Sequence, residues 1–275
     1  MGAPKIVVFD SGLGGLTVYR ELKAILPDAC YLYVADNAAF PYGDLTEDEL
    51  VARLLALFAQ LIDSEKPDVC VIACNTASTI ALEPLRDHFE VPFVGTVPAI
   101  KVAAEQSETK MFSVLATPGT VKRDYTRDLI DSYASSCDVT LVGASHLAEL
   151  AEQFMRGESV NLDDIRTEIR SAFVEKNGRR TDIVALGCTH FPLLTEKMKE
   201  AAPWPVSYID PAPAIARRTL VILGEMTKNL NGNDWEDSSQ PNRLIYTGSD
   251  NIAHKIIGFL RGIGLADVYR DEIIG

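Results

Sequence analysis

The chain has 275 residues, a length that fits one large domain or, more typically, two smaller ones. Its 26 lysines and arginines against 39 aspartates and glutamates give a net charge of −13, which disfavours nonspecific binding to nucleic acid or anionic lipid. No apolar run approaches the ~18 residues of a membrane span, and the residues from Met1 to Gly12 run into a strand pattern without the cationic region, long apolar segment or cleavage site typical of a leader peptide. We therefore expect a cytoplasmic protein that acts on a small molecule and requires neither a membrane nor nucleic acid.

Short apolar runs that are typical of buried strands recur along the whole chain. In chain order they are Lys5–Phe9, Tyr31–Ala35, Val69–Ala73, Phe112–Ala116, Val139–Gly143, Ile183–Gly187, Val206–Asp210 and Arg243–Thr247. Between them lie segments with apolar residues at helical spacing, among them Glu47–Glu65 and Asp163–Lys176. This alternation predicts an α/β fold, in which mainly parallel sheets are covered by helices on both faces and ligands bind beyond the carboxyl ends of the strands.

A weak internal repeat divides the chain into two halves. In each half a strand runs into a glycine-containing loop, at Asp10–Gly15 and at Thr117–Thr120, and a later strand ends at a cysteine, Cys74 or Cys188. We therefore expect two similar α/β domains, and we hypothesise that both thiols point into one cleft between them.

The boundary between the halves is expected near Val94–Lys101, where a strand ends and Pro98 is able to open a helix. The polar stretch Asn229–Asn242 is expected to be a surface insertion rather than a domain linker.

Neither glycine-containing loop matches a nucleotide-binding signature. In DSGLGG the dinucleotide fingerprint that starts at Gly12 would need glycine where Thr17 stands, and no Gly-Lys-Ser/Thr follows for a phosphate loop. What remains is a helix N-terminus that can present backbone N–H groups to an anion, a carboxylate as well as a phosphate. The alternative is a helix start that needs only a tight backbone and a cap, but it would leave Asp10 facing the cleft without a reason.

Five cysteines, an odd number without dense spacing, predict reduced thiols rather than a disulfide framework. Cys30, Cys70 and Cys137 lie within or just before apolar runs and are expected to be inert fillers. Cys74 and Cys188 stand where a strand ends and a helix is expected to begin, and a helix N-terminus favours the thiolate. We therefore expect these two thiols to be functional.

A zinc site is the alternative for these cysteines. Cys70 and Cys74 lack the usual knuckle geometry, however, and Cys188 with His190 completes no ligand set, so no metal site is expected. His190 alone could be a capping residue, but two positions after a thiol it can also hold or exchange a proton.

Two thiols that face each other across a pocket fit the inversion of a stereocentre that carries hydrogen. One group must remove the proton from one face while another delivers a proton to the opposite face. A cysteine near a carboxylate or histidine can be held as thiol or activated as thiolate for either task. This chemistry implies no metal and no pyridoxal, and the sequence contains no evident cofactor motif.

Five motifs carry a resemblance to a known family: VFDSGLGGLTV, ADNAAFPYG, ACNTAS, VLATPGTV and LGCTHFPLL. Together they resemble the glutamate racemases of bacterial cell-wall synthesis, and this resemblance covers nearly the whole chain. The resemblance implies two α/β domains related by a pseudo-twofold axis, residues 1–97 with 211–275 and residues 98–210, with the active site in the cleft between them. It also implies cofactor-independent interconversion of L- and D-glutamate for peptidoglycan, and pairing as a homodimer.

The resemblance assigns roles position by position. Cys74 and Cys188 match the two acid/base thiols, Asp10 and His190 match the groups that assist them, and Glu152 resembles a glutamate near the second thiol. The residues that match substrate-binding positions are Asp10, Ser11, Tyr42, Gly43, Asn75, Thr76, Thr117, Thr120, Thr189 and His190.

Other functions remain open at this point. The chain could be an aspartate racemase or a related decarboxylase or isomerase, although a decarboxylase would need only one thiol. It could also bind an acidic amino acid without catalysis, or regulate a partner, as in the gyrase inhibition attributed to some relatives.

Overall fold

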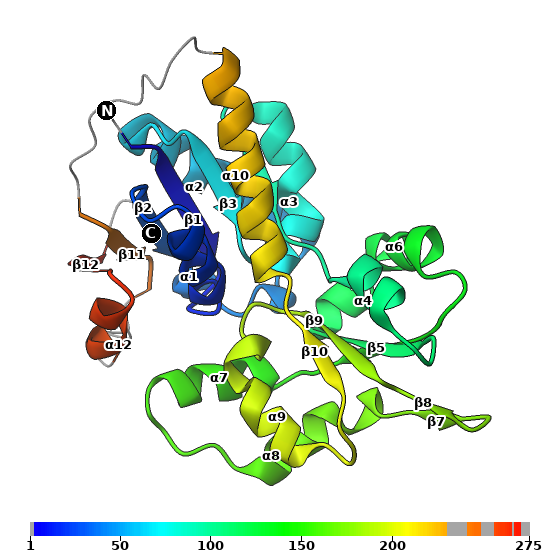
Figure 1. Cartoon of the computed structure of the whole chain (residues 1–275). Coiled ribbons are helices and arrows are strands. Elements are labelled where there is room, and N and C mark those ends of the chain that lie inside the picture. Colours follow the sequence, from blue (N-terminus) through cyan, green and yellow to red (C-terminus); the bar gives the residue numbers. More distant parts are fainter. Residues whose placement is uncertain (1–2, 230–240, 249–255, 266, 271–275) are drawn as a thin grey trace. The chain divides into compact units, whose positions relative to one another are not determined.

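The structure, a computed structural model, describes residues 3–229, 241–248, 256–265 and 267–270 (Figure 1). Residues 230–240, most of the expected surface insertion Asn229–Asn242, lie outside the described residues. Contacts divide the chain into two compact units, residues 1–96 with 212–275 and residues 97–211. Within the described residues, no helix is both long enough and apolar enough to cross a membrane.

The first unit is built around a six-stranded sheet in the order β12-β11-β2-β1-β3-β4, and all of its described pairings are parallel. The strands are β1 (Lys5–Asp10), β2 (Cys30–Ala35), β3 (Val69–Ile72), β4 (Phe93–Gly95), β11 (Arg243–Tyr246) and β12 (Asp267–Arg270). The late strand β11 pairs with β2, so the end of the chain completes a sheet begun at its start (Figure 1).

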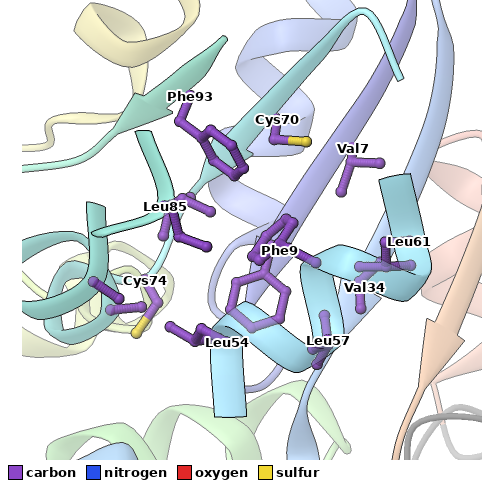
Figure 2. Close-up of a cluster of buried hydrophobic side chains, with 14 of the residues drawn as sticks. Val7, Phe9, Val34, Leu54, Leu57, Leu61, Cys70, Cys74, Leu85 and Phe93 are labelled. Carbon is purple, nitrogen blue, oxygen red and sulfur yellow. The ribbon is translucent and has the colours of Figure 1, made fainter. Parts of the chain in front are cut away.

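Helices cover both faces of this sheet. Because successive strand residues point to opposite faces, Val7 and Phe9 of β1 pack on α2 (Glu47–Glu65) and α3 (Asn75–His88), in the core cluster that Figure 2 shows. On the other face Tyr31 of β2 meets Tyr19 of α1 (Leu16–Ile25) with ring centroids 5.2 Å apart, and α1 packs on α10 (Ala212–Asn229). A short helix, α12 (Ile257–Gly262), precedes β12.

Helix α2 illustrates why these segments fold locally as predicted. Thr46 accepts a hydrogen bond from the backbone N–H of Glu49, whose carboxylate accepts one from the Thr46 N–H, so a capping box starts the helix. The buried residues of α2 recur at helical spacing and form one apolar face: Leu50, Leu54, Leu57, Phe58 and Leu61. Lys66 ends the helix in the left-handed conformation, with φ 49°.

The second unit contains a four-stranded parallel sheet in the order β10-β9-β5-β6. Its strands are β5 (Met111–Ala116), β6 (Asp138–Gly143), β9 (Ile183–Gly187) and β10 (Ser207–Ile209). Its helices are α4 (Ile100–Gln106), α5 (Pro118–Val121), α6 (Asp124–Tyr133), α7 (Leu147–Met155), α8 (Leu162–Ile169) and α9 (Thr195–Ala201). Phe112 and Val114 of β5 pack against α4 and α6, whereas Ser113 donates from the opposite face to the Ala172 carbonyl at 2.6 Å.

The expected helix over Asp163–Lys176 is wrong in its second half. Helix α8 ends at Ile169 and passes into the 3₁₀ turn η3 (Arg170–Ala172), after which β7 (Glu175–Lys176) pairs with β8 (Arg179–Arg180). Asn177 and Gly178, both with positive φ, form the turn of this hairpin, and such a turn takes its flanking residues out of the helix. The eight expected strands and the α/β class are confirmed.

In both sheets the direction of strand addition reverses at the first strand, β1 or β5. Strand β2 lies on one side of β1 and β3 on the other, and in the same way β6 and β9 flank β5. In parallel α/β sheets, ligands bind beyond the carboxyl ends of the strands at such a point. The orders β2-β1-β3-β4 and β6-β5-β9-β10 are the same, which agrees with the internal repeat.

Candidate functional site

Each candidate thiol follows an interior strand beside the reversal point of its sheet, β3 next to β1 and β9 next to β5. Cys74 comes two residues after β3, and Cys188 directly follows β9. We call the group around Cys74 the first half-site; it comprises Asp10, Ser11, Tyr42, Gly43, Cys74, Asn75 and Thr76. We call the group around Cys188 the second half-site; it comprises Thr117, Thr120, Glu152, Cys188, Thr189 and His190.

Asp10 ends β1 and is completely buried. Its Oδ1 accepts hydrogen bonds from the backbone N–H of Gly12 at 2.9 Å and from the Ser11 hydroxyl at 3.3 Å, and the same hydroxyl lies 3.7 Å from Cys74 Sγ. Ser11 therefore links the carboxylate to the thiol. Gly15 makes this packing possible, because a Cβ there would lie 2.8 Å from the Asp10 Cβ.

Cys74 is the N-cap of the fourteen-residue helix α3 and has an extended backbone, with φ −65° and ψ 123°. Its side chain is 6% exposed and lies at the margin of the core cluster in Figure 2, whereas Cys70 belongs to the strand. The first turn of a helix presents unpaired N–H groups and a positive potential, which favour a thiolate at the cap. Burial raises the pKa of the Cys70 thiol, so that residue stays protonated, as expected of a filler.

The residues after Cys74 bring two further polar side chains into the first half-site. Asn75 is 3% exposed, and within the described residues neither its amide nitrogen nor its amide oxygen has a hydrogen-bond partner. Thr76 is buried in the same helical turn. A buried amide without partners costs free energy in the folded protein, so Asn75 is a candidate for binding a polar ligand.

Tyr42 and Gly43 lie in the 3₁₀ turn η2 (Tyr42–Asp44). The Tyr42 ring is buried and stacks on Phe9, and its hydroxyl donates to Asp36 Oδ2 at 2.5 Å. Burial and the adjacent Asp36 carboxylate hold the pKa of Tyr42 well above its usual value, and a charge on Cys74 adds to this effect. The phenol therefore stays protonated, while Gly43 beside it is exposed.

The second half-site contains a chain of three buried side chains. Cys188 Sγ lies 3.8 Å from His190 Nδ1, and His190 Nε2 lies 3.0 Å from Glu152 Oε1 of α7. All three residues are at most 7% exposed. Arg156, directly after α7, places its guanidinium 3.7 Å from Glu152 Oε2.

Two hydrogen-bond partners affect the pKa of His190 more strongly than its burial does. Burial alone would lower the pKa of His190, but hydrogen bonds to Cys188 and Glu152, and the negative charges of both, hold it well above the usual value. A protonated imidazole donates from both ring nitrogens, so His190 can donate to the thiolate and the carboxylate at the same time. The arrangement can therefore take up and release a proton at Cys188.

Three threonines complete the second half-site. Thr117 caps α5, its hydroxyl lies 3.1 Å from that of Thr120, and both follow β5 at the reversal point. Thr120 is completely buried and Thr189 is 4% exposed. Thr117 and Thr120 follow β5, and Thr189 follows Cys188 after the neighbouring strand β9.

One local expectation about Cys188 is wrong. The chain after it does not begin an α-helix directly but forms the 3₁₀ turn η4 (Phe191–Leu194), and α9 starts at Thr195. Pro192 lies in the first turn of η4. A helix N-terminus therefore supports Cys74, whereas a histidine and a carboxylate support Cys188.

Sequence reasoning did not find four residues that support the half-sites. These are Asp36, with Arg53 and Thr247 that both donate to it, behind Tyr42, and Arg156 behind Glu152. Only Asp36 carried a signal, since it follows β2 in the motif ADNAAFPYG. In the part of the chain that the structure describes, no group of three His, Cys, Asp or Glu side chains could hold a metal ion.

Comparisons with known proteins agree on one family. A family model described as Asp/Glu/Hydantoin racemase matches residues 8–219. A curated glutamate racemase of Brucella canis is 50% identical over 261 residues, which cover 94% of this chain and 92% of the relative.

Solved structures extend this similarity to the fold. The glutamate racemase of Escherichia coli, in complex with L-glutamate and the activator UDP-MurNAc-Ala, matches with a TM-score of 0.89 and 38% identity over 98% of both chains. The glutamate racemase of Thermus thermophilus, in complex with β-chloro-D-alanine, matches with a TM-score of 0.74 and 27% identity over 98% of this chain and 97% of its own. The chain belongs to the Asp/Glu/hydantoin racemase family.

Proposed function

We propose that the protein interconverts L-glutamate and D-glutamate through two bases, Cys74 and Cys188, without a cofactor. The observation that carries this proposal is a buried thiol at the reversal point of each sheet, Cys74 beside Ser11, which donates to Asp10, and Cys188 beside His190. The names of its relatives in the racemase family supply the substrate.

The proposed reaction transfers one proton at each face of the α-carbon. A thiolate on one face takes the α-proton, and the electron pair of the broken C–H bond stays on the α-carbon as a carbanion. The thiol on the other face then gives its proton to that carbon, which inverts the centre and leaves a thiolate there. Charge and protons balance, and the two sulfurs have exchanged protonation states.

The supporting groups determine how each thiol changes protonation state. Asp10 and the N-terminus of α3 act on Cys74, and the pair His190 and Glu152 acts on Cys188. We assign Cys74 to proton removal from D-glutamate and Cys188 to proton removal from L-glutamate, as the family resemblance implies.

We propose that residues of the two half-sites, which lie near the carboxyl ends of the strands, bind the substrate. The residues are Asp10, Ser11, Tyr42, Gly43, Asn75, Thr76, Thr117, Thr120, Thr189 and His190. Asn75 has the strongest support among them, because its buried amide has no other partner in the described residues. We further propose that the product supplies D-glutamate for peptidoglycan in the cytoplasm and that the protein pairs as a homodimer.

The test is to incubate the purified protein with L-glutamate and, separately, with L-aspartate, and to follow circular dichroism in buffer that contains EDTA. The signal of glutamate should decay to zero as an equal mixture of enantiomers forms, and that of aspartate should persist. Cys70→Ala is the matched control for Cys74→Ala, since it removes a thiol from the same strand region and should keep activity. Decay with aspartate alone, or no decay at all, would overturn the proposal.

A further inference from the structure

A buried carboxylate behind the first half-site collects four hydrogen bonds. Asp36 directly follows β2 and is completely buried. Its Oδ1 accepts from Arg53 Nη2 at 2.5 Å and from the Thr247 hydroxyl at 2.6 Å. Its Oδ2 accepts from Arg53 Nε at 2.6 Å and from the Tyr42 hydroxyl at 2.5 Å. We call these four residues the Asp36 cluster.

The four donors use the full acceptor capacity of the carboxylate. A carboxylate offers about four lone-pair sites. Arg53 supplies two donors to these sites, and Tyr42 and Thr247 supply one donor each. The guanidinium also balances the charge of Asp36, with the Arg53 side chain 29% exposed. Asp36 therefore has nothing left to offer a ligand and can influence one only through its neighbours.

Tyr42 is the neighbour that belongs to the first half-site. The proton of its hydroxyl is committed to Asp36, so the ring cannot rotate its oxygen elsewhere without losing a charge-assisted hydrogen bond. The ring stacks on Phe9 and lies in the same buried cluster as Cys74. Gly43 continues the same 3₁₀ turn, so the tether at Asp36 also holds the backbone of that turn.

Thr247 ties the cluster to the late part of the chain. It follows β11, and its hydroxyl accepts from the backbone N–H of Ala38 at 3.1 Å while it donates to Asp36. The next residue, Gly248, donates its N–H to Asn37 Oδ1 at 2.9 Å. The loop after β2 is thus held by both the helix α2 and the strand β11.

We propose that Asp36 is a positioning residue for catalysis, which holds Tyr42 and the Tyr42–Gly43 turn in the orientation that binds glutamate beside Cys74. This inference rests on the proposed function. It assigns to the Asp36–Arg53 pair a role in substrate affinity in addition to any role in stability.

Asp36→Asn tests the proposal because it keeps the shape but replaces one acceptor oxygen by an NH₂ group. At the Oδ2 position the NH₂ would face donors of Arg53 and Tyr42, and the phenol would lose its acceptor. At the Oδ1 position it would face Arg53 and Thr247, and the phenol would keep only a neutral acceptor. In both cases the charge-assisted hydrogen bond of the phenol is lost. A charge-assisted hydrogen bond contributes about 1.5–3 kcal/mol, so we expect KM for glutamate to rise roughly 10-fold or more, with kcat changed far less. Tyr42→Phe, which leaves the Asp36–Arg53 pair intact, should raise KM to a similar extent.

The double variant separates action through Tyr42 from independent effects. If Asp36 acts through the phenol, the double variant Asp36→Asn/Tyr42→Phe should have the same KM as the single variant with the higher KM. Independent effects would instead multiply the two increases in KM. Thr247→Val is the matched control, because it removes a donor from the Oδ1 that Tyr42 does not use. It should lower the unfolding midpoint while KM stays within about twofold.

Three results would overturn the inference: an unchanged KM in Tyr42→Phe, multiplied effects in the double variant, or a rise in KM for Thr247→Val equal to that for Asp36→Asn. Tyr42→Phe decides the question if Asp36→Asn does not fold. Glutamate affinity by calorimetry is measured alongside turnover. A wild-type protein that binds glutamate without racemising it would refute the proposed function, and the affinities would still test the role of Asp36.

Discussion

Asn75→Ala should weaken glutamate binding without destabilising the free protein. In the folded chain the Asn75 amide is buried and has no partner among the described residues, so alanine removes a desolvation cost of about 1–3 kcal/mol. Alanine also favours the first turn of α3 by about 0.5 kcal/mol. Lost packing costs roughly 1–2 kcal/mol in the opposite direction. Together these terms change the free energy of unfolding by between about −0.5 and about +2.5 kcal/mol, so the variant should be about as stable as the wild type or more stable.

Affinity should respond differently from stability. A hydrogen bond from the Asn75 amide to a charged group of glutamate contributes about 1.5–3 kcal/mol, which corresponds to a Kd roughly 10- to 100-fold higher in the variant. Chemical denaturation gives the stability, and calorimetry with glutamate gives the Kd.

Ser78→Ala is the matched control in the same helix. The Ser78 hydroxyl donates to the Ile72 carbonyl at 3.0 Å and accepts from the Thr96 N–H at 2.9 Å, so its loss leaves buried backbone groups without partners. We expect this variant to lose about 1–3 kcal/mol of stability and to keep its affinity for glutamate. The reasoning fails if Asn75→Ala is as unstable as Ser78→Ala and binds glutamate as tightly as the wild type.

Three further predictions concern the acid/base groups. Asp10→Asn keeps the shape but removes the charge, and kcat should fall far more than KM rises in steady-state kinetics; a change confined to KM would make Asp10 a binding residue only. Because the folded pKa of His190 is raised, its protonation stabilises the fold fully below the unfolded pKa of about 6.5 and less as pH rises through the folded pKa. Glu152→Gln should therefore reduce the loss of stability as pH rises above about 6.5 in denaturant titrations, and an unchanged slope would count against the pair. Alkylation of the two candidate thiols, located by mass mapping, should abolish turnover, glutamate should protect both, and full activity after modification would exclude their role.

Most of the fold was predictable because parallel α/β sheets leave local signals. Each of the eight apolar runs expected to be strands is a strand, since a strand buried on both faces needs such a run. The strands that were not expected are short: β7 and β8 have two residues each, and β12 has four. The apolar spacing of Asp163–Lys176 continues past Ile169 and predicts one helix, whereas the turn at Asn177 and Gly178 decides where the helix ends.

The candidate site was predictable only where chain position determines it. Cys74 and Cys188 could be found because a residue at the carboxyl end of a central parallel strand must lie near the reversal point of the sheet. The Asp36 cluster could not, because Arg53 lies 17 residues away on a helix and Thr247 lies 211 residues away after β11. Which polar groups meet across such separations depends on sheet order, which periodicity does not specify.

The most direct test of the two-base proposal is racemisation of L-glutamate in heavy water, stopped at early conversion. The thiol that donates has exchanged its proton with solvent, while the thiolate that abstracts can only return the original proton. The account predicts deuterium at the α-carbon of the D-glutamate formed and almost none in the L-glutamate that remains. Equal deuterium in both enantiomers, or a product that retains the original proton, would contradict proton transfer by two separate thiols.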